Sequence, residues 1–309
     1  MRIACVGTYI VDVLGRPVTE LPRGQSSRIL DEIRITVAGT AGGTAVDLAK
    51  LGADVVAIGA IGRDLAGDLM VLALQEHGVD TSGLVRKAGV QTSCTMLPIH
   101  PDGSRPAWHV PGANRTFTLD DVYWDALAEC DAVHLGGLTA LPGVDGEPAG
   151  RILAHARAHG ALTSADCLRV RGEDPEPLIA AVMPHADLFM PNEAEARGIA
   201  GDPDPASAAR RFRAHGARCA IVKRGPDGCV IVDDDGERSL PAFAAPVVDT
   251  TGCGDAFCAG VIVGRLKGWT VDEAARLGCA LGALNLRGLG SDAGARDLDE
   301  ALAFMGAYA

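Results

Sequence analysis

The sequence is poor in aromatic residues, and it has no cluster of basic residues and no long apolar run. Phe, Trp and Tyr make up 4% of the 309 residues, so the core must be built from Ala, Val, Leu and Ile. The net charge is −12 and no Lys/Arg run is present, which argues against nucleic acid as a partner because phosphate contacts need clustered cations. No apolar run reaches the length that a membrane-spanning helix needs, so we expect no membrane partner.

Cysteine occurs at nine positions, but no two of them form a Cys-x-x-Cys pair. This spacing argues against structural zinc, and a disulfide framework is not expected in a chain of this length. Residues 1–7 read as a first strand rather than a signal peptide. We therefore expect reduced, buried thiols in a cytoplasmic protein.

Apolar runs and helical patterns alternate regularly from residue 132 onwards. Because 48% of the residues are hydrophobic, the chain can bury one large core, and we expect a single domain over residues 1–309. The alternation predicts an α/β fold with a mainly parallel sheet and helices on both of its faces. The strands predicted in this part are residues 132–135, 162–165, 188–190, 220–223 and 229–232.

Several strand-like segments do not follow this alternation. Residues 28–37 alternate between apolar and polar side chains, as a half-exposed strand does. Together with later segments they predict a small separate sheet, drawn from about residues 28–37 and 84–110. The later strands expected in it are residues 93–99 and 107–110, joined by 84–87, with a hairpin turn at Asp102-Gly103.

Residues 249–257, Asp-Thr-Thr-Gly-Cys-Gly-Asp-Ala-Phe, follow a β-like run over 245–248 and lead into a helical pattern over 255–266. The N–H groups that begin a helix have no partner within the helix and attract anions. Gly252 and Gly254 let the backbone approach an anion closely. Asp255 adds a carboxylate, which suits a site that removes a proton while N–H groups stabilise negative charge. An Asp at a helix start and a Gly-x-Gly before a helix are each also common in ordinary helix starts that bind no ligand.

The whole stretch resembles the C-terminal signature of the PfkB (ribokinase-like) family of carbohydrate and nucleoside kinases, with Cys253 where Ala is usual. The resemblance implies a ribokinase-like three-layer α/β/α fold, in which the small sheet is a lid over the sugar. It also implies that Asp255 is the catalytic base. The anion hole would be formed by the backbone of Gly252, Cys253 and Gly254.

The resemblance extends to the acceptor side of the site. Residues 9–25 contain two prolines and are predicted to form a loop. Asp12, within this segment, matches an acidic residue that binds sugar hydroxyls in the family. Residues 38–52 resemble the family's first Gly-rich turn and helix, and Gly43 replaces an Asn that commonly contacts the sugar. The acceptor contacts implied are Asp12, Gly39, Thr40, Gly43, Arg105 and Asp255.

Two further motifs resemble the nucleotide side of the family's site. Asn192 and Glu195 match Asn-x-x-Glu, which organises Mg²⁺ through water near the phosphates. Residues 223–228 match Lys-x-Gly-x-x-Gly, which passes the phosphates and ribose. The nucleotide contacts implied are Asn192, Lys223, Gly225, Gly228, Gly254 and Cys279. Asp249 and Thr251 correspond to positions that hold a potassium ion in some relatives.

The resemblance, which covers essentially the whole chain, implies a kinase that transfers the γ-phosphoryl group of ATP, with Mg²⁺, to a hydroxyl of a sugar or sugar-like alcohol. Lid strands in this family often pair between subunits, so the resemblance also implies a homodimer through the lid. A nucleoside kinase is an alternative because Gly43 lacks the sugar-binding amide, although few aromatic residues are present to stack on a base. A catalytically silent sugar or nucleotide sensor is a second alternative, which the retained Asp255 disfavours. A dinucleotide-binding dehydrogenase is disfavoured because no Gly-x-Gly-x-x-Gly follows the first strand.

Overall fold

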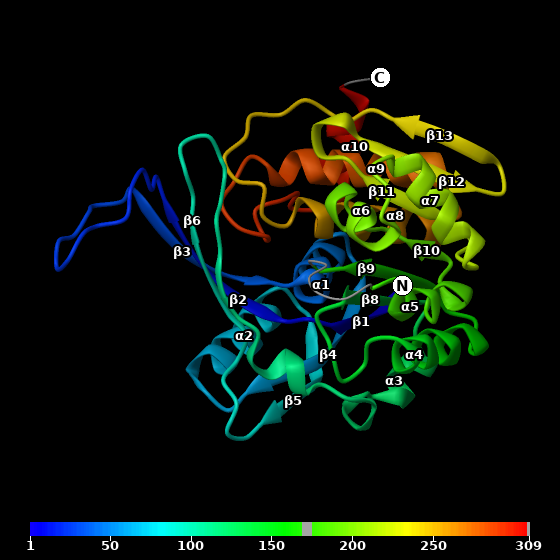
Figure 1. Cartoon of the computed structure of the whole chain (residues 1–309), viewed down its shortest axis with the longest axis horizontal. Helices are drawn as coiled ribbons and strands as arrows, with labels where there is room; N and C mark the ends of the chain where they lie inside the picture. The colour runs from blue at the N-terminus through cyan, green and yellow to red at the C-terminus, as the bar shows by residue number, and fades with distance from the viewer. Residues whose placement is uncertain (169–174, 308–309) are drawn as a thin grey trace.

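A computed structural model describes residues 1–168 and 175–307 of the chain. In this part of the chain, a nine-stranded sheet has the order β13-β12-β11-β10-β9-β8-β1-β4-β5 (Figure 1). All neighbouring strands from β11 to β5 are parallel, while β12 pairs antiparallel with β11 and with β13. The strands are β1 (Arg2–Gly7), β4 (Asp54–Gly62), β5 (Asp80–Lys87), β8 (Ala132–Leu138), β9 (Leu162–Cys167), β10 (Leu188–Phe189), β11 (Ala220–Lys223), β12 (Cys229–Asp233) and β13 (Gly236–Leu240).

Helices cover both faces of this sheet, as the alternation of the sequence predicts. Ile3 and Cys5 of β1 pack in one hydrophobic core with α1, α2, α8 and α9, whereas Ala4 and Val6 pack in another with α4 and α7. Successive side chains of a strand point to opposite faces, so a strand buried on both faces is apolar throughout. The helices are α1 (Thr40–Lys50), α2 (Leu65–Glu76), α3 (Trp124–Ala128), α4 (Glu147–Ala158), α5 (Glu176–Ala180), α6 (Glu193–Ala200), α7 (Pro205–Ala214), α8 (Cys253–Leu266), α9 (Val271–Asn285) and α10 (Leu298–Gly306).

A second sheet of four strands extends from the main body, on the left of Figure 1. Its order is β3 (Glu32–Ala38), β2 (Ile10–Arg16), β6 (Cys94–Pro98) and β7 (Trp108–Val110). We call this sheet the lid. The turn at Asp102-Gly103 lies between the antiparallel strands β6 and β7, as predicted.

Two predictions about segments in and near the lid are wrong. The loop expected over residues 9–25 contains β2, which lies between β3 and β6 at the centre of the lid. Its prolines do not interrupt this strand, because Pro17 follows directly after its last residue, Arg16. Residues 84–87 belong to β5, which pairs in parallel with β4 at the edge of the large sheet and not with the lid.

The lid has one polar and one apolar face, because residues that are directly opposite on neighbouring strands share a face. Cross-strand pairing places Thr36, Asp12, Thr95 and His109 in one row. The adjacent row, which faces the other way, is Ile35, Val13, Met96 and Trp108. Asp12 is 5% exposed, whereas Met96 is 57% exposed. The polar row therefore faces the main body and the apolar row faces solvent.

The strand expected at 245–248, before the signature stretch, is absent from the structure. Pro246 interrupts this segment and has no N–H group for a sheet. The N–H group of Val248 donates instead to the carbonyl oxygen of Leu286 at 2.8 Å. The helix that follows is α8, and it begins at Cys253, two residues before the predicted start at Asp255. No helix within residues 1–168 or 175–307 is both long and apolar enough to cross a membrane.

Candidate active site

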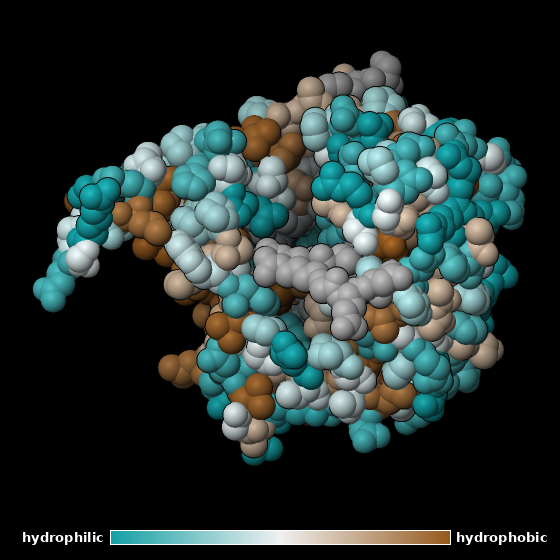
Figure 2. Space-filling model, in the orientation of Figure 1, coloured by the Kyte–Doolittle hydropathy of each residue, from teal (hydrophilic) through white to brown (hydrophobic). Residues whose placement is uncertain are grey.

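A cavity of about 1110 Å³ lies between the lid, the carboxyl ends of the parallel strands and the start of α8. Figure 2 shows the surface hollowed between the lid and the main body. In open α/β sheets, ligands bind at this edge of the strands. The predicted site residues that line the cavity are Asp12, Gly39, Thr40, Arg105, Asn192, Glu195, Lys223, Gly225, Gly228, Thr251, Gly252, Cys253, Gly254, Asp255 and Cys279.

The start of α8 forms one wall of the cavity. Gly252 precedes the helix with φ of 80°, and a Cβ at this position would lie 2.4 Å from Cα of Ser291. Only glycine fits this left-handed, close-packed turn. The N–H groups of the first helical turn have no acceptor within the helix and carry the positive end of its dipole. Burial raises the pKa of the Cys253 thiol to about 12, so this side chain adds no negative charge to the anion site.

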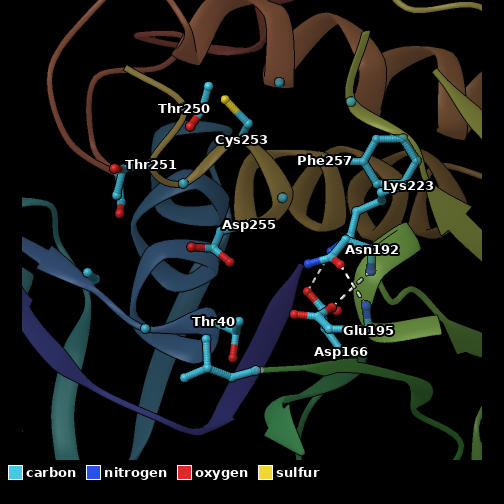
Figure 3. A pocket seen from close by; sticks show the side chains of 18 of the residues that line it. Thr40, Asp166, Asn192, Glu195, Lys223, Thr250, Thr251, Cys253, Asp255 and Phe257 are labelled. Atoms are coloured by element: carbon cyan, nitrogen blue, oxygen red, sulfur yellow. Dashed lines mark hydrogen bonds and ion pairs between the residues drawn. The ribbon is translucent and has the colours of Figure 1, made fainter. Parts of the chain in front are cut away.

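Asp255 lies in the first turn of α8, and its side chain lies between that turn and Thr40 (Figure 3). The residue is 9% exposed. Burial, joined by the negative charge of Asp166, raises the pKa of the Asp255 carboxyl well above its usual value, while the charge of Lys223 opposes this shift. A carboxylate with a raised pKa beside helix N–H groups can accept a proton from a hydroxyl group.

Gly43 does not line the cavity, in contrast to its predicted acceptor contact. It lies in α1, and a Cβ at this position would lie only 2.4 Å from Oδ2 of Asp255. The Asp255 carboxylate therefore occupies the space that a side chain at residue 43 would fill. Gly43, where the family commonly has Asn, therefore changes the surroundings of Asp255.

Lys223 and Asp166 form a buried ion pair beside the anion site. Lys223 ends β11 and Asp166 lies near the end of β9, and Nζ donates to Oδ2 at 2.6 Å. Burial alone would lower the pKa of Lys223, but the charge of Asp166 outweighs it, and the pKa is raised above its ordinary value. The Lys223 Nζ is also 3.2 Å from where a Cβ of Gly254 would lie, so a charged ammonium group sits against the first turn of α8.

Asp166 lines the cavity but is not among the residues predicted from motifs. A sequence signal for it exists, since it is an acidic residue close to the end of a predicted strand in an open α/β sheet. The role of Asp166 depends on its ion pair with Lys223, which is 57 residues away in the chain. The sequence around either residue does not indicate this contact.

Asn192 and Glu195 form a capping box at the start of α6. Oδ1 of Asn192 accepts from the Glu195 N–H group, and Oε2 of Glu195 accepts from the Asn192 N–H group, both at 2.9 Å. The motif thus caps a helix start, and both side chains also line the cavity (Figure 3). Within the described ranges, no three His, Cys, Asp or Glu residues are grouped to hold a metal ion by themselves. Mg²⁺ does not need such a group, because it is usually held by one or two carboxylates, phosphates and water.

The lid supplies polar groups to the opposite wall. Burial raises the pKa of Asp12 to about 7, although a hydrogen bond from Thr95 and the charge of Arg105 lower it. Arg105 comes from the loop between β6 and β7, and its Nε donates to Oγ1 of Thr250 at 3.2 Å. Arg105 thus joins the lid to the turn that precedes α8.

The glycine-rich turn before α1 lies between these two walls. Gly39 has φ of 86°, and a Cβ there would lie 2.5 Å from the carbonyl oxygen of Thr8. Oγ1 of Thr40 lies 3.1 Å from Oγ1 of Thr8. Together these contacts bring the backbone at the start of α1 to the floor of the cavity.

The far end of the cavity is mainly apolar. Gly225 begins the short 3-10 helix η4 (Gly225–Asp227), and Gly228 follows it in a turn that packs against the carbonyl oxygen of Leu240. Cys279 of α9 lies on the same wall and is 8% exposed. Further residues that line the cavity are mostly apolar or glycine: Pro226, Ala242, Phe243, Ala244, Gly278, Gly282, Ala283 and Leu286.

Asp249 is fully buried and does not line the cavity. Its Oδ1 accepts from N and Oγ1 of Thr251 at 3.0 and 2.8 Å, and its Oδ2 accepts from the N–H group of Gly290 at 2.9 Å. Asn285, at the end of α9, donates from Nδ2 to the carbonyl oxygen of Thr251. These side chains support the turn before α8 from below.

Residues 1–297 match the model of the pfkB family of carbohydrate kinases. An uncharacterized sugar kinase of Archaeoglobus fulgidus is 29% identical over 75% of this chain and 90% of its own length. An ATP-dependent ribose-1-phosphate kinase of Halopiger xanaduensis is 28% identical over 92% of this chain and 91% of its own length.

Solved structures share the fold. Ribokinase of Arabidopsis thaliana, in complex with ribose and ATP, superposes with a TM-score of 0.82 at 22% identity and covers 98% of both chains. A ribokinase II from E. coli, in complex with ATP and Mg²⁺, superposes with a TM-score of 0.85 at 22% identity and covers 99% of both chains. These two likenesses establish the ribokinase-like architecture.

Proposed function

Because the chain belongs to the pfkB family of carbohydrate kinases and is a phosphotransferase with an alcohol acceptor, we propose that Asp255 is its catalytic base. The observation that carries this proposal is the position of the Asp255 carboxylate. It lies in the cavity, in the first turn of α8, where helix N–H groups attract an anion. A base beside an anion site matches a reaction that removes a hydroxyl proton while phosphate oxygens are held nearby.

In the proposed reaction, ATP is the phosphoryl donor and the acceptor is a hydroxyl group of a sugar or sugar-like alcohol. The oxygen of that hydroxyl forms a bond to the γ-phosphorus, its proton passes to Asp255, and the bond to the ADP oxygen breaks. The backbone of Gly252, Cys253 and Gly254 stabilises the oxygens of the transferring group. Phosphoryl transfer depends mostly on positioning and electrostatic stabilisation, which these N–H groups supply without reorganisation.

Lys223 and Asp166 are assigned to the phosphate end of the site. The chain carries a net charge of −12, so it must concentrate positive charge where a nucleotide binds. The Lys223 ammonium lies against the first turn of α8 and is kept charged by its ion pair with Asp166. The turn from Gly225 to Gly228 then leads to the apolar end of the cavity, where we place the adenine near Cys279.

Magnesium fits the oxygen donors near this phosphate end. Glu195 and Asp166 offer carboxylate oxygens and Asn192 offers an amide oxygen, and all three residues line the cavity. When bound with ATP, Mg²⁺ would offset phosphate charge and fix the phosphate orientation. A potassium ion near Asp249 and Thr251 would rely mainly on main-chain carbonyl oxygens, because the Asp249 carboxylate already accepts three hydrogen bonds.

The lid is assigned to the acceptor. Asp12 would accept hydrogen bonds from sugar hydroxyls, with Gly39 and Thr40 on the adjacent wall and Arg105 at the edge. A lid that closes over the acceptor would exclude water and so limit hydrolysis of ATP. The apolar outer row, with Ile35, Met96 and Trp108 all about half exposed, supports pairing with a second lid in a homodimer. Figure 2 shows hydrophobic side chains along the lid surface.

A coupled ADP-release assay with MgATP and a panel of sugars, sugar acids, sugar phosphates and nucleosides tests the proposed function. One strong sugar-type acceptor would support it and would identify the substrate class. Turnover with a nucleoside alone would favour the nucleoside kinase. No turnover with any acceptor, while calorimetry detects ATP binding, would contradict the proposed activity and favour a sensor.

A further inference from the structure

The loop of residues 289–292 lies between the lid and the turn that begins the anion site. On the lid side it contacts β3, and on the other side it contacts the carboxylate of Asp249 and the backbone of Gly252. Neither the motifs nor the proposed catalytic steps account for this double contact. The loop is therefore placed where a movement of the lid could be transmitted to the anion site.

Arg34 of β3 makes the contacts on the lid side. Its Nη1 donates to the carbonyl oxygen of Leu289 at 2.8 Å, and its Nη2 forms an ion pair with Oδ2 of Asp292 at 2.9 Å. Asp292 is the less exposed partner, with 16% of its side chain accessible against 37% for Arg34. Thr36, two residues along the same strand, packs against Gly290, where a Cβ would lie 2.8 Å from Cγ2 of Thr36. Two donors in fixed geometry hold the loop to this strand.

Asp249 and Gly252 make the contacts on the site side. The N–H group of Gly290 donates to Oδ2 of Asp249 at 2.9 Å, while Oδ1 of the same carboxylate accepts from Thr251. Gly252 packs its Cα directly against Ser291, with no room for a Cβ. Because the loop and the turn are joined by this one hydrogen bond and by close backbone packing, a displacement of the loop would be transmitted to the turn.

We propose that Arg34 is a positioning residue, which couples the lid to the anion site through Asp292, Gly290 and Asp249. This inference rests on the proposed function, since it assigns to Arg34 an effect on the phosphoryl-transfer step. Arg34 does not line the cavity, and in this proposal it acts on bound substrate through the loop. Holding Gly252 in its left-handed conformation keeps the first N–H groups of α8 aimed at the transferring phosphoryl group.

Arg34→Met tests the coupling in steady-state kinetics. We expect kcat to fall by about tenfold or more, with KM for ATP changed by less than about threefold, because misplacement of oriented groups affects the transition state more than substrate binding. Arg34→Lys keeps the charge but not the fork of donors, so it should restore only part of the rate. Asp292→Asn should cause a similar loss, and the double variant should lose little more than either single variant.

The matched control is the ion pair between Arg16 and Glu32. It lies on the same lid strands, with Nε of Arg16 2.8 Å from Oε2 of Glu32. Arg16→Met removes a similar cation from the lid without touching residues 289–292, and we expect it to leave kcat unchanged. An equal loss of kcat in both variants would overturn the proposal, since it would show a general effect of lid charge.

Hydrogen–deuterium exchange of residues 249–257 separates failure of this inference from failure of the proposed function. We expect faster exchange of this segment in Arg34→Met than in wild type and in Arg16→Met, whether or not an acceptor is found. Faster exchange with no turnover in wild type would support the coupling and contradict the kinase activity. Unchanged exchange and unchanged kcat in an active enzyme would overturn the coupling alone.

Discussion

Gly43 and Asp255 touch across the packed helices α1 and α8, with the Cβ position of residue 43 only 2.4 Å from Oδ2 of Asp255. Thr44 strengthens this contact through a hydrogen bond from Oγ1 to the carbonyl oxygen of Asp255 at 3.5 Å. The carboxylate assigned as the base can thus occupy its position because Gly43, on the neighbouring helix, has no side chain. Its position is a property of two segments that are far apart in the sequence.

Gly43→Ala should displace the Asp255 carboxylate and reduce kcat by about tenfold to a hundredfold, because a misplaced catalytic group loses its orientation. The fold should survive, since the group that must move is the end of a side chain. Gly42→Ala is the matched control, because its methyl group would meet Val37 and Tyr9 instead of the site. Equal kcat for the two variants would contradict the role given to this contact.

The pH–rate profile should show that activity requires an ionised Asp255. Burial and the Asp166 charge raise the pKa of this carboxyl, so kcat/KM should rise as pH increases through that pKa. The Lys223 charge opposes the shift, and Lys223→Met should therefore move the acidic limb of the profile to higher pH. The measurement is kcat/KM across the pH range at saturating MgATP. A limb that stays in place or moves to lower pH would contradict the assignment.

Asp12 should make stability depend on pH. Its pKa is raised from 3.8 to about 7 in the folded protein, so between these values the folded state binds a proton more tightly than the unfolded chain. The free energy of unfolding should therefore fall as pH rises through this window. Asp12→Asn should remove this component. Urea unfolding should show the variant stabilised relative to wild type at about pH 8 and less so at about pH 5.

Asp12→Asn also has a kinetic consequence at the acceptor end. Loss of an anionic acceptor for sugar hydroxyls should raise KM for the acceptor more than it lowers kcat. No change in KM for the acceptor would place the sugar elsewhere in the cavity.

The outer face of the lid should carry a dimer contact. Met96→Asp puts a charge in the middle of the apolar row, and we expect it to convert the protein to a monomer by light scattering. Leu72→Asp on α2 is the control, because Leu72 is also exposed, at 59%, but lies outside the lid. A monomer mass for the wild type would contradict the dimer.

The layers of the fold and most residues of the cavity can be predicted from the sequence, because glycine turns and capped helices leave local signals. The turn around Gly252 is an example. The glycine itself indicates a left-handed conformation, and the residues next to it indicate the start of a helix. β2 is not predicted from the sequence, because Pro17 follows the strand instead of breaking it. The roles of Asp166 and Gly43 are not predicted either, because their partners Lys223 and Asp255 lie far away in the chain. Such contacts depend on packing that no local pattern specifies.

The most direct test of the central claim is Asp255→Asn, measured once the acceptor is known. The account predicts that kcat falls by about 10²–10⁴-fold, the range for loss of a general base, while calorimetry shows ATP binding within about threefold of wild type. Removal of a buried negative charge should not lower thermal stability, because burial disfavours the ionised form of Asp255. A variant with kcat comparable to wild type would contradict Asp255 as the base.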